Sequence, residues 1–303
     1  MNNAGNVNIP NNLISLAQSI APMTAAVVCA HHKSAMESTK QAVEYRLIKP
    51  ILIGNKKLIC EEANKLDWDL NSVEIIDHNI KEEAAVAGAQ LAKDNKIQII
   101  IKGDLHTDIL MKIYLKKEFG LIEGTRLSHI WHMTTPNHPK PIFITDGALN
   151  VAPRIDVKMH ILRNVVEFAK KTGISKPKVA VLSGTEDPIE SMPSSMDAKE
   201  IMMRAKQENI DAYVHGPLAF DNAISEEAAK IKDINNEVAG KADVLLVPNL
   251  ETGNSLSKIM VYFMNACAAG FVVGGKVPVV VTSRADNAAS RLASIAASII
   301  AAQ

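Results

Sequence analysis

Short runs of aliphatic and β-branched residues alternate with longer segments of helical periodicity along most of the chain. The runs have the length and composition of buried strands. They are Thr24–Ala30, Pro50–Gly54, Val73–Asp77, Ile97–Ile101, Leu127–Met133, Pro141–Thr145, Lys178–Ser183, Ala212–His215, Asp243–Val247 and Val277–Thr282. Helical spacing recurs in Lys33–Arg46, Ile80–Lys96, Asp156–Thr172, Ala198–Glu208 and Ser225–Ala239. This alternation predicts an α/β fold with mostly parallel sheets.

A proline-containing stretch, TTPNHPKP at residues 134–141, predicts a loop between two of these strands. We place a domain boundary just beyond the second strand, near Asn150–Pro153. The final strand and helix are expected to return to the first domain, as in many doubly wound folds. The prediction is one α/β domain from residues 1–150 plus 274–303 and a second from residues 151–273.

Composition excludes several classes of protein. The 303 residues are 47% hydrophobic, and 33 basic residues balance 33 acidic ones, so neither disorder nor nucleic-acid binding is expected. We expect no membrane span and no signal peptide. Three distant cysteines indicate reduced thiols and a cytoplasmic protein. No zinc-ligand spacing and no G-x-G-x-x-G motif occurs, so we predict neither a metal nor a Rossmann dinucleotide site.

Polar motifs follow two of the predicted strands at their carboxyl ends, where α/β folds bind ligands. The first motif, KGDLHTD at residues 102–108, makes His106 and Thr107 candidate substrate-binding residues. Its alternative reading is a strand-to-helix turn that Thr107 or Asp108 caps. The second motif, DGALNVAP at residues 146–153, places Asp146 in a candidate cleft, and Asp156 is a candidate cap for the helix that follows.

Three further segments could bind an anion. Arg126, which enters a strand beside Ser128 and His129, could hold phosphate through its planar guanidinium, or could lie free on the surface. Thr252–Ser255, which includes Gly253 and Asn254, could present backbone N–H groups at a helix N-terminus.

The third segment joins a hydroxyl, a guanidinium and a carboxylate where the last helix begins. Ser283, Arg284 and Asp286 could together hold a phosphate and stabilise an oxyanion. The alternative is a helix cap followed by an exposed arginine.

Taken together, these motifs resemble the phosphate acetyltransferase and phosphate butyryltransferase family. The resemblance is closest to the acyltransferase part of bifunctional enoyl-CoA hydratase/phosphate acetyltransferase proteins. It rests on six segments in the family's order: KGDLHTD at 102–108, RLSHIWHM at 126–133, ITDGALNVAP at 144–153, GPLAFDNAIS at 216–225, ADVLLVPNLETGNSLSK at 242–258 and VPVVVTSRADNAASRLASIA at 277–296.

The resemblance implies two α/β domains with an interdomain cleft, similar in architecture to isocitrate and isopropylmalate dehydrogenases, and a homodimer. It implies reversible transfer of a short acyl group, acetyl to butyryl, between coenzyme A (CoA) and inorganic phosphate. CoA is then a substrate, and neither a metal nor a cofactor is implied.

The family's roles fall on particular residues of this chain. By resemblance, Arg284 and Arg126 hold phosphate and Ser283 stabilises the reacting centre. Acetyltransferase members have an Asp seven positions beyond that Ser, which is proposed to take the thiol proton of CoA. This chain has Ser290 at that position. Asp286 is the nearest substitute, and we expect it to share a helix face with position 290.

Two other functions stay open at this stage. One is a protein of the same fold that binds CoA or phosphate without turnover, which the Ser290 departure keeps open. The other is a metal- and NAD-dependent decarboxylating dehydrogenase, which would need a cluster of metal-binding aspartates that the sequence does not obviously provide.

Overall fold

The computed structural model describes residues 7–122, 124–138, 140–282 and 286–303. Its contacts divide the chain into two compact units, residues 1–125 with 269–303, and residues 126–268. The sequence placed the divisions after residues 150 and 273 instead. Residues 126–150 fall in the second unit because the strand at Ile142–Thr145 pairs with the strand at Val244–Leu246, and the strand at Ser128–Thr134 pairs with the former.

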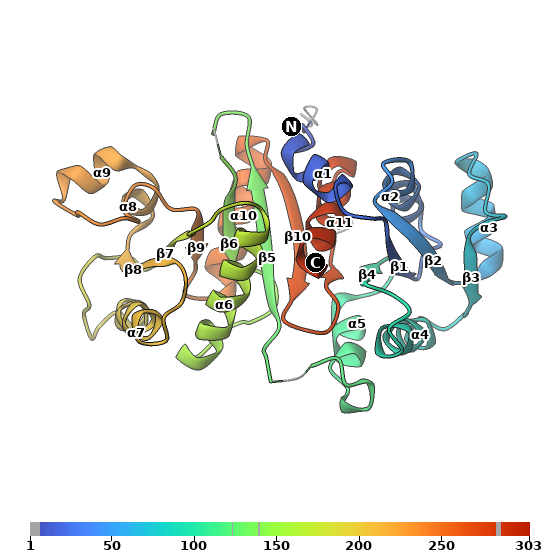
Figure 1. The fold of residues 1–303 in the computed structure, drawn as a ribbon, viewed down its shortest axis with the longest axis horizontal. Helices are drawn as coiled ribbons and strands as arrows, with labels where there is room; N and C mark the ends of the chain where they lie inside the picture. The colour runs from blue at the N-terminus through green and yellow to red at the C-terminus, as the bar shows by residue number, and fades with distance from the viewer. Residues whose placement is uncertain (1–6, 123, 139, 283–285) are drawn as a thin grey trace. The chain divides into compact units, whose positions relative to one another are not determined.

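The first unit is built on strands β1 (Met23–Val28), β2 (Ile48–Gly54), β3 (Glu74–Asp77), β4 (Ile99–Lys102), β10 (Cys267–Val273) and β11 (Val279–Val280). They lie in the order β3-β2-β1-β4-β11-β10, and all neighbours are parallel except β10 and β11 (Figure 1). Its helices are α1 (Asn11–Gln18), α2 (Lys33–Glu44), α3 (Lys56–Lys65), α4 (Lys81–Lys93), α5 (Thr107–Tyr114) and α11 (Ala288–Ala302), with a 3₁₀ turn at Lys117–Phe119.

The second unit is built on β5 (Ser128–Thr134), β6 (Ile142–Thr145), β7 (Lys178–Leu182), β8 (Tyr213–Leu218) and β9 (Val244–Leu246). They lie in the order β5-β6-β9-β7-β8, and β5 with β6 is the antiparallel pair. Its helices are α6 (Ile155–Lys171), α7 (Pro193–Gln207), α8 (Phe220–Ile224), α9 (Glu226–Ile231) and α10 (Leu250–Met264). The mixed α/β fold with mostly parallel sheets is confirmed; the dehydrogenase-like architecture and the cleft stay predictions.

Burial explains why the central strands read as continuous apolar runs. In β1 and β4, residues such as Val27 and Ile100 have no exposed surface, because helices cover both faces of a parallel sheet. In the second unit, side chains of β5, β6, β7 and β9 meet Leu256, Met260 and Val261 of α10 in one apolar cluster. Each unit therefore has its own core, and loops at the strand ends carry the polar chemistry.

Two differences from the sequence prediction have a local cause. The helix expected over Ser225–Ala239 ends at Ile231, because Asp233 adopts a left-handed conformation and Asn236 accepts hydrogen bonds from the Val238 and Ala239 N–H groups. These contacts make a turn instead of a helix. Strand β10 was not predicted, because its sequence, CAAGFVV, begins with small residues that do not favour a strand.

Candidate active site

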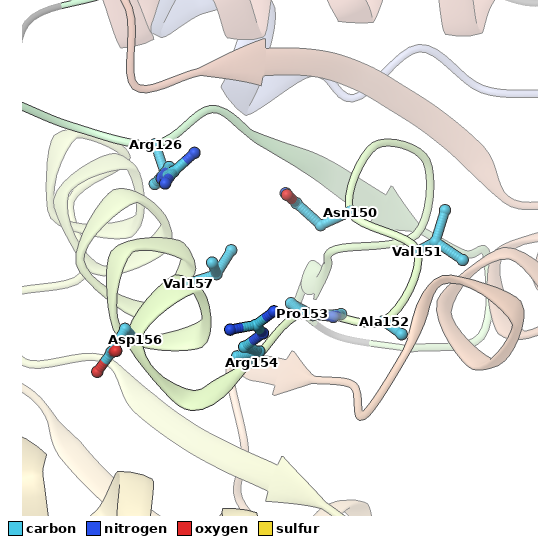
Figure 2. Close-up of a pocket in the computed structure, with 8 residues that line it drawn as sticks. All are labelled: Arg126, Asn150, Val151, Ala152, Pro153, Arg154, Asp156 and Val157. Atoms are coloured by element: carbon cyan, nitrogen blue, oxygen red, sulfur yellow. The ribbon is translucent and has the colours of Figure 1, made fainter.

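A pocket of about 480 Å³ opens in the second unit, where β5 begins and the loop after β6 leads into α6. Arg126 lies on one side of it, and Arg154, Asp156 and Val157 lie at the start of α6 (Figure 2). Asn150, Val151, Ala152 and Pro153 complete its lining. Two of the predicted anion-binding and cleft segments therefore meet here. Sequence reasoning missed Arg154, which directly follows the quoted motif at residues 144–153.

Asp146 organises the loop that forms this pocket. It is 2% exposed, and its carboxylate accepts four hydrogen bonds: from the N–H groups of His129, Ala148 and Leu149, and from Asn150 Nδ2 at 2.7 Å. Because protein donors occupy both oxygens, Asp146 fixes the path of residues 146–150 and ties it to β5. Its predicted contact with substrate stays untested, and its local role is to position the loop.

A close backbone contact joins this loop to α10. A Cβ atom at Gly147 would lie 2.8 Å from the Gly253 carbonyl carbon, and one at Gly253 would lie 2.7 Å from the Gly147 Cα. Such distances are shorter than side-chain carbons tolerate, so both positions require glycine. Asn254 Nδ2 also donates to the Gly147 carbonyl oxygen at 3.4 Å. The motifs around residues 147 and 253 therefore form one packed structure.

The start of α10 differs from the expected anion site. Asn249 is its N-cap and accepts from the Thr252 N–H at 3.0 Å, and the Gly253 N–H donates to the Asn249 carbonyl oxygen. The expectation that the Gly253 N–H faces an anion is thus wrong. The helix begins about one turn earlier than such an anion site requires, so this N–H is already bonded within the helix. Contact of Gly253 and Asn254 with substrate through other atoms stays a prediction.

In the first unit, the KGDLHTD loop is held against the loop after β1. Val28 and Lys102, which end β1 and β4, are paired in register, and the Asp104 N–H donates to the Cys29 carbonyl oxygen at 2.8 Å. Lys81 Nζ lies 2.9 Å from the Asp104 carboxylate. His106 is the N-cap residue of α5, makes no side-chain cap hydrogen bond, and is exposed; Thr107 follows it. Capping by Thr107 or Asp108 was therefore a wrong expectation.

Asp286 lies in the first unit, directly before the N-cap of α11. Asn287 is that cap and accepts from the Ser290 N–H at 2.8 Å. Asp286 is therefore neither the cap nor a helical residue, and the expectation that it shares a helix face with position 290 is wrong. The buried Arg291 donates from Nε to the Asp286 carbonyl oxygen at 3.1 Å and from Nη1 to Thr282 Oγ1 at 3.3 Å. Ser283 and Arg284 lie outside the described residues.

Burial shapes the charge states near the pocket. His129 and His132 of β5 are 1% and 4% exposed. Burial lowers the pKa of His129 to about 4, although the Asp146 carboxylate opposes this, and burial likewise lowers the pKa of His132 to about 4. Both ring nitrogens of His129 lack a hydrogen-bond partner among the described residues. Both imidazoles are therefore neutral at pH 7 and belong to the core.

Within the described part of the chain, no group of three His, Cys, Asp or Glu side chains is arranged to hold a metal ion. Over the same residues, no helix has the length and hydropathy that crossing a membrane requires.

Comparison with known proteins identifies the relationship. The family described as "Phosphate acetyl/butaryl transferase" matches residues 78–301. The chain belongs to this family. All of the predicted site residues, Ser283 and Arg284 among them, fall inside the matched range.

Individual phosphate acetyl- and butyryltransferases match over nearly their full length. A phosphate acetyltransferase of Rhizobium meliloti is 39% identical over 94% of this chain and 90% of its own. A phosphate butyryltransferase of Clostridium acetobutylicum is 35% identical over 94% of this chain and 95% of its own. A branched-chain phosphotransacylase from Enterococcus faecalis shares the fold with a TM-score of 0.82 and 31% identity over 92% of this chain and 99% of its own. These similarities favour an acyltransferase over either alternative function.

Proposed function

We propose that the protein transfers a short acyl group, acetyl to butyryl, reversibly between CoA and inorganic phosphate. The observation that carries this proposal is the family match over residues 78–301, which spans every motif that sequence reasoning selected. Identities of 35–39% to both acetyl- and butyryltransferases support the reaction class, and they leave both chain lengths within the proposal.

The proposed reaction uses residues of this chain without a metal or cofactor. In the direction of acyl-CoA formation, the CoA thiol gives its proton to Asp286 and its sulfur attacks the acyl carbonyl carbon. Ser283 stabilises the oxyanion that forms. The carbon–oxygen bond to phosphate then breaks, and phosphate leaves with the bonding electrons, held by Arg284 and Arg126. His106 and Thr107 contact the substrate from the loop after β4.

A turnover assay tests the function. Purified protein with acetyl-, propionyl- or butyryl-CoA should release free thiol only when inorganic phosphate is present, and thiol is followed with a chromogenic disulfide. Adding EDTA should leave the rate unchanged, because no metal takes part. If none of the three acyl-CoA substrates yields thiol, the protein does not catalyse this reaction, and a binding protein without turnover becomes the better interpretation.

We further propose that the protein acts as a homodimer, for which an exposed apolar surface on α10 gives support. Ile259, Tyr262, Phe263 and Met264 lie near the end of this helix, and Phe263 is 85% exposed. Large apolar side chains grouped on a surface commonly mark an interface with another chain. A cytoplasmic location stays a prediction.

Replacement of Phe263 tests the dimer. Phe263→Asp should convert a dimer into a monomer, measured as a halved mass by light scattering after size exclusion, because a buried charge without a partner opposes association. Ile231→Asp is the matched control: this side chain is 77% exposed on α9 of the same unit. A mass that is unchanged in Phe263→Asp would show that α10 is not the interface, and a monomeric parent would refute the dimer itself.

A further inference from the structure

Two arginines line the same pocket of the second unit, and within the described part of the chain neither side chain has a partner. Among the described residues, neither Arg126 nor Arg154 has an ion pair or a side-chain hydrogen bond, although most acidic and basic side chains around α6 are paired. Figure 2 shows both guanidinium groups at the rim of one hollow, with Val157 between them in this view. Two cations that face one space, with no partner among the described residues, repel each other, so an anion between them would relieve a repulsion.

We propose that Arg126 and Arg154 together bind one phosphoryl dianion in this pocket, at the start of α6. The proposal deepens the proposed function, on which it rests for the identity of the ligand, and it assigns to Arg154 a role that sequence reasoning did not give it. A planar guanidinium matches the geometry of phosphoryl oxygens, and two of them balance the charge of a dianion.

The end of α6 adds donors to the same space. Arg154 occupies the N-cap position but makes no side-chain cap hydrogen bond, and the first N–H that bonds to a helix carbonyl is that of Lys158, to Arg154 at 2.9 Å. Among the described residues, no acceptor is seen for the N–H groups of residues 155–157. Free N–H groups at the positive end of a helix of 17 residues favour an anion, and here they accompany two guanidinium groups.

The acidic residue of the pocket is held away from this space. Asp156 lines the pocket, but its carboxylate accepts from Arg204 Nη1 at 2.7 Å, while Arg204 Nε bonds to Glu200 at 2.8 Å. Figure 2 shows the Asp156 carboxylate pointing away from both Arg126 and Arg154. Arg204 thus neutralises and orients the one carboxylate among the lining residues that would oppose an anion.

The remaining lining residues are uncharged, and the amide among them, that of Asn150, is held in place. Asn150 Nδ2 donates to the Leu127 carbonyl oxygen at 2.9 Å and to Asp146 at 2.7 Å, so its position is set by buried partners. A volume of about 480 Å³ exceeds what a single phosphate fills. The phosphoryl group could therefore be inorganic phosphate or one of the phosphates of CoA, which share this chemistry.

Direct binding measurements test the proposal and separate the two sources. Inorganic phosphate and CoA are titrated separately into the full-length protein by calorimetry, without acyl substrate. Arg154→Gln and Arg126→Gln should each lower the affinity for one of these ligands by about tenfold or more, as loss of a charged hydrogen bond does. Weaker phosphate binding with unchanged CoA binding assigns the site to inorganic phosphate, and the reverse assigns it to CoA. Lys206→Gln, which removes an exposed cation of α7 outside the pocket, is the matched control.

A second variant keeps the proposal testable if the arginine variants unfold, which thermal melting would reveal. Arg204→Gln releases the Asp156 carboxylate, which would then oppose the anion, so the affinity for the same ligand should fall several-fold. Adding Asp156→Asn removes that charge and should restore the affinity. If all variants melt like the parent and neither ligand's affinity changes in Arg154→Gln or Arg204→Gln, the proposal is wrong. Absence of turnover in the parent would refute the proposed function alone, because the binding measurements do not depend on catalysis.

Discussion

Asp286→Asn should lower kcat for phosphate-dependent thiol release by about a hundredfold or more, which is the contribution of a positioned general base. The amide has nearly the same shape but cannot take the thiol proton. The structure sharpens this test, because Asn287, and not Asp286, caps α11. The substitution therefore removes no cap, and the backbone carbonyl oxygen that accepts from Arg291 is retained.

The control for this prediction is Asp67→Asn. Asp67 is an exposed residue of the same unit with a left-handed backbone, which asparagine also adopts readily. It should keep the parent rate. Rates are compared at several pH values between 6 and 9. If Asp286→Asn melts like the parent and stays within a few-fold of its rate at every pH, another group is the base.

The second large effect is a loss of folding stability in acid that the two buried histidines of β5 cause. The pKa of each, about 4, lies below the ordinary value of 6.5, so the folded protein binds fewer protons than the unfolded chain between these values. The contribution of the two neutral histidines to folding stability is complete above pH 6.5 and is lost as pH falls towards 4. Because a tenfold difference in proton affinity corresponds to about 1.4 kcal/mol, the loss from each histidine is about 2 kcal/mol at pH 5 and about 3 kcal/mol at pH 4.

Unfolding in urea at pH 7.5 and pH 5 measures this effect. His129→Leu and His132→Leu cannot be protonated, so each variant should lose about 2 kcal/mol less stability than the parent between these pH values. His138→Gln, which removes an exposed imidazole of the same unit, serves as the control. The comparison uses the change with pH, which does not depend on how each substitution alters packing. Equal acid sensitivity in all four proteins would contradict the assignment.

The strands were predictable from the sequence because strands that are buried on both faces consist of continuous apolar runs. Each predicted strand overlaps an observed one, from Thr24–Ala30 on β1 to Val277–Thr282 on β11. The periodicity failed where single residues act through backbone conformation. The turn after Ile231 depends on the backbone conformation of Asp233 and on the side-chain hydrogen bonds of Asn236. Neither residue type by itself excludes a helix.

The candidate site was predictable as motifs but not as contacts. Arg126 and the loop after β6 were both selected, yet only folding brings them to one pocket with Arg154. The helix boundaries at Asn249 and Asn287 were each misplaced by a few residues. That error changed which N–H groups lie at the end of α10 and whether Asp286 belongs to α11. A cap depends on local backbone geometry, which residue type only partly specifies.

The backbone contact between Gly147 and Gly253 limits how this protein can be recombined with its relatives. The two glycines lie 106 positions apart in the chain but share one contact surface, which leaves no space for a methyl group on either side. A chimera that imports one of these segments from a relative with a larger residue there would separate the two backbones. Such exchanges are expected to succeed only when glycine is kept at both positions or both segments are exchanged together, so residues distant in sequence constrain recombination jointly.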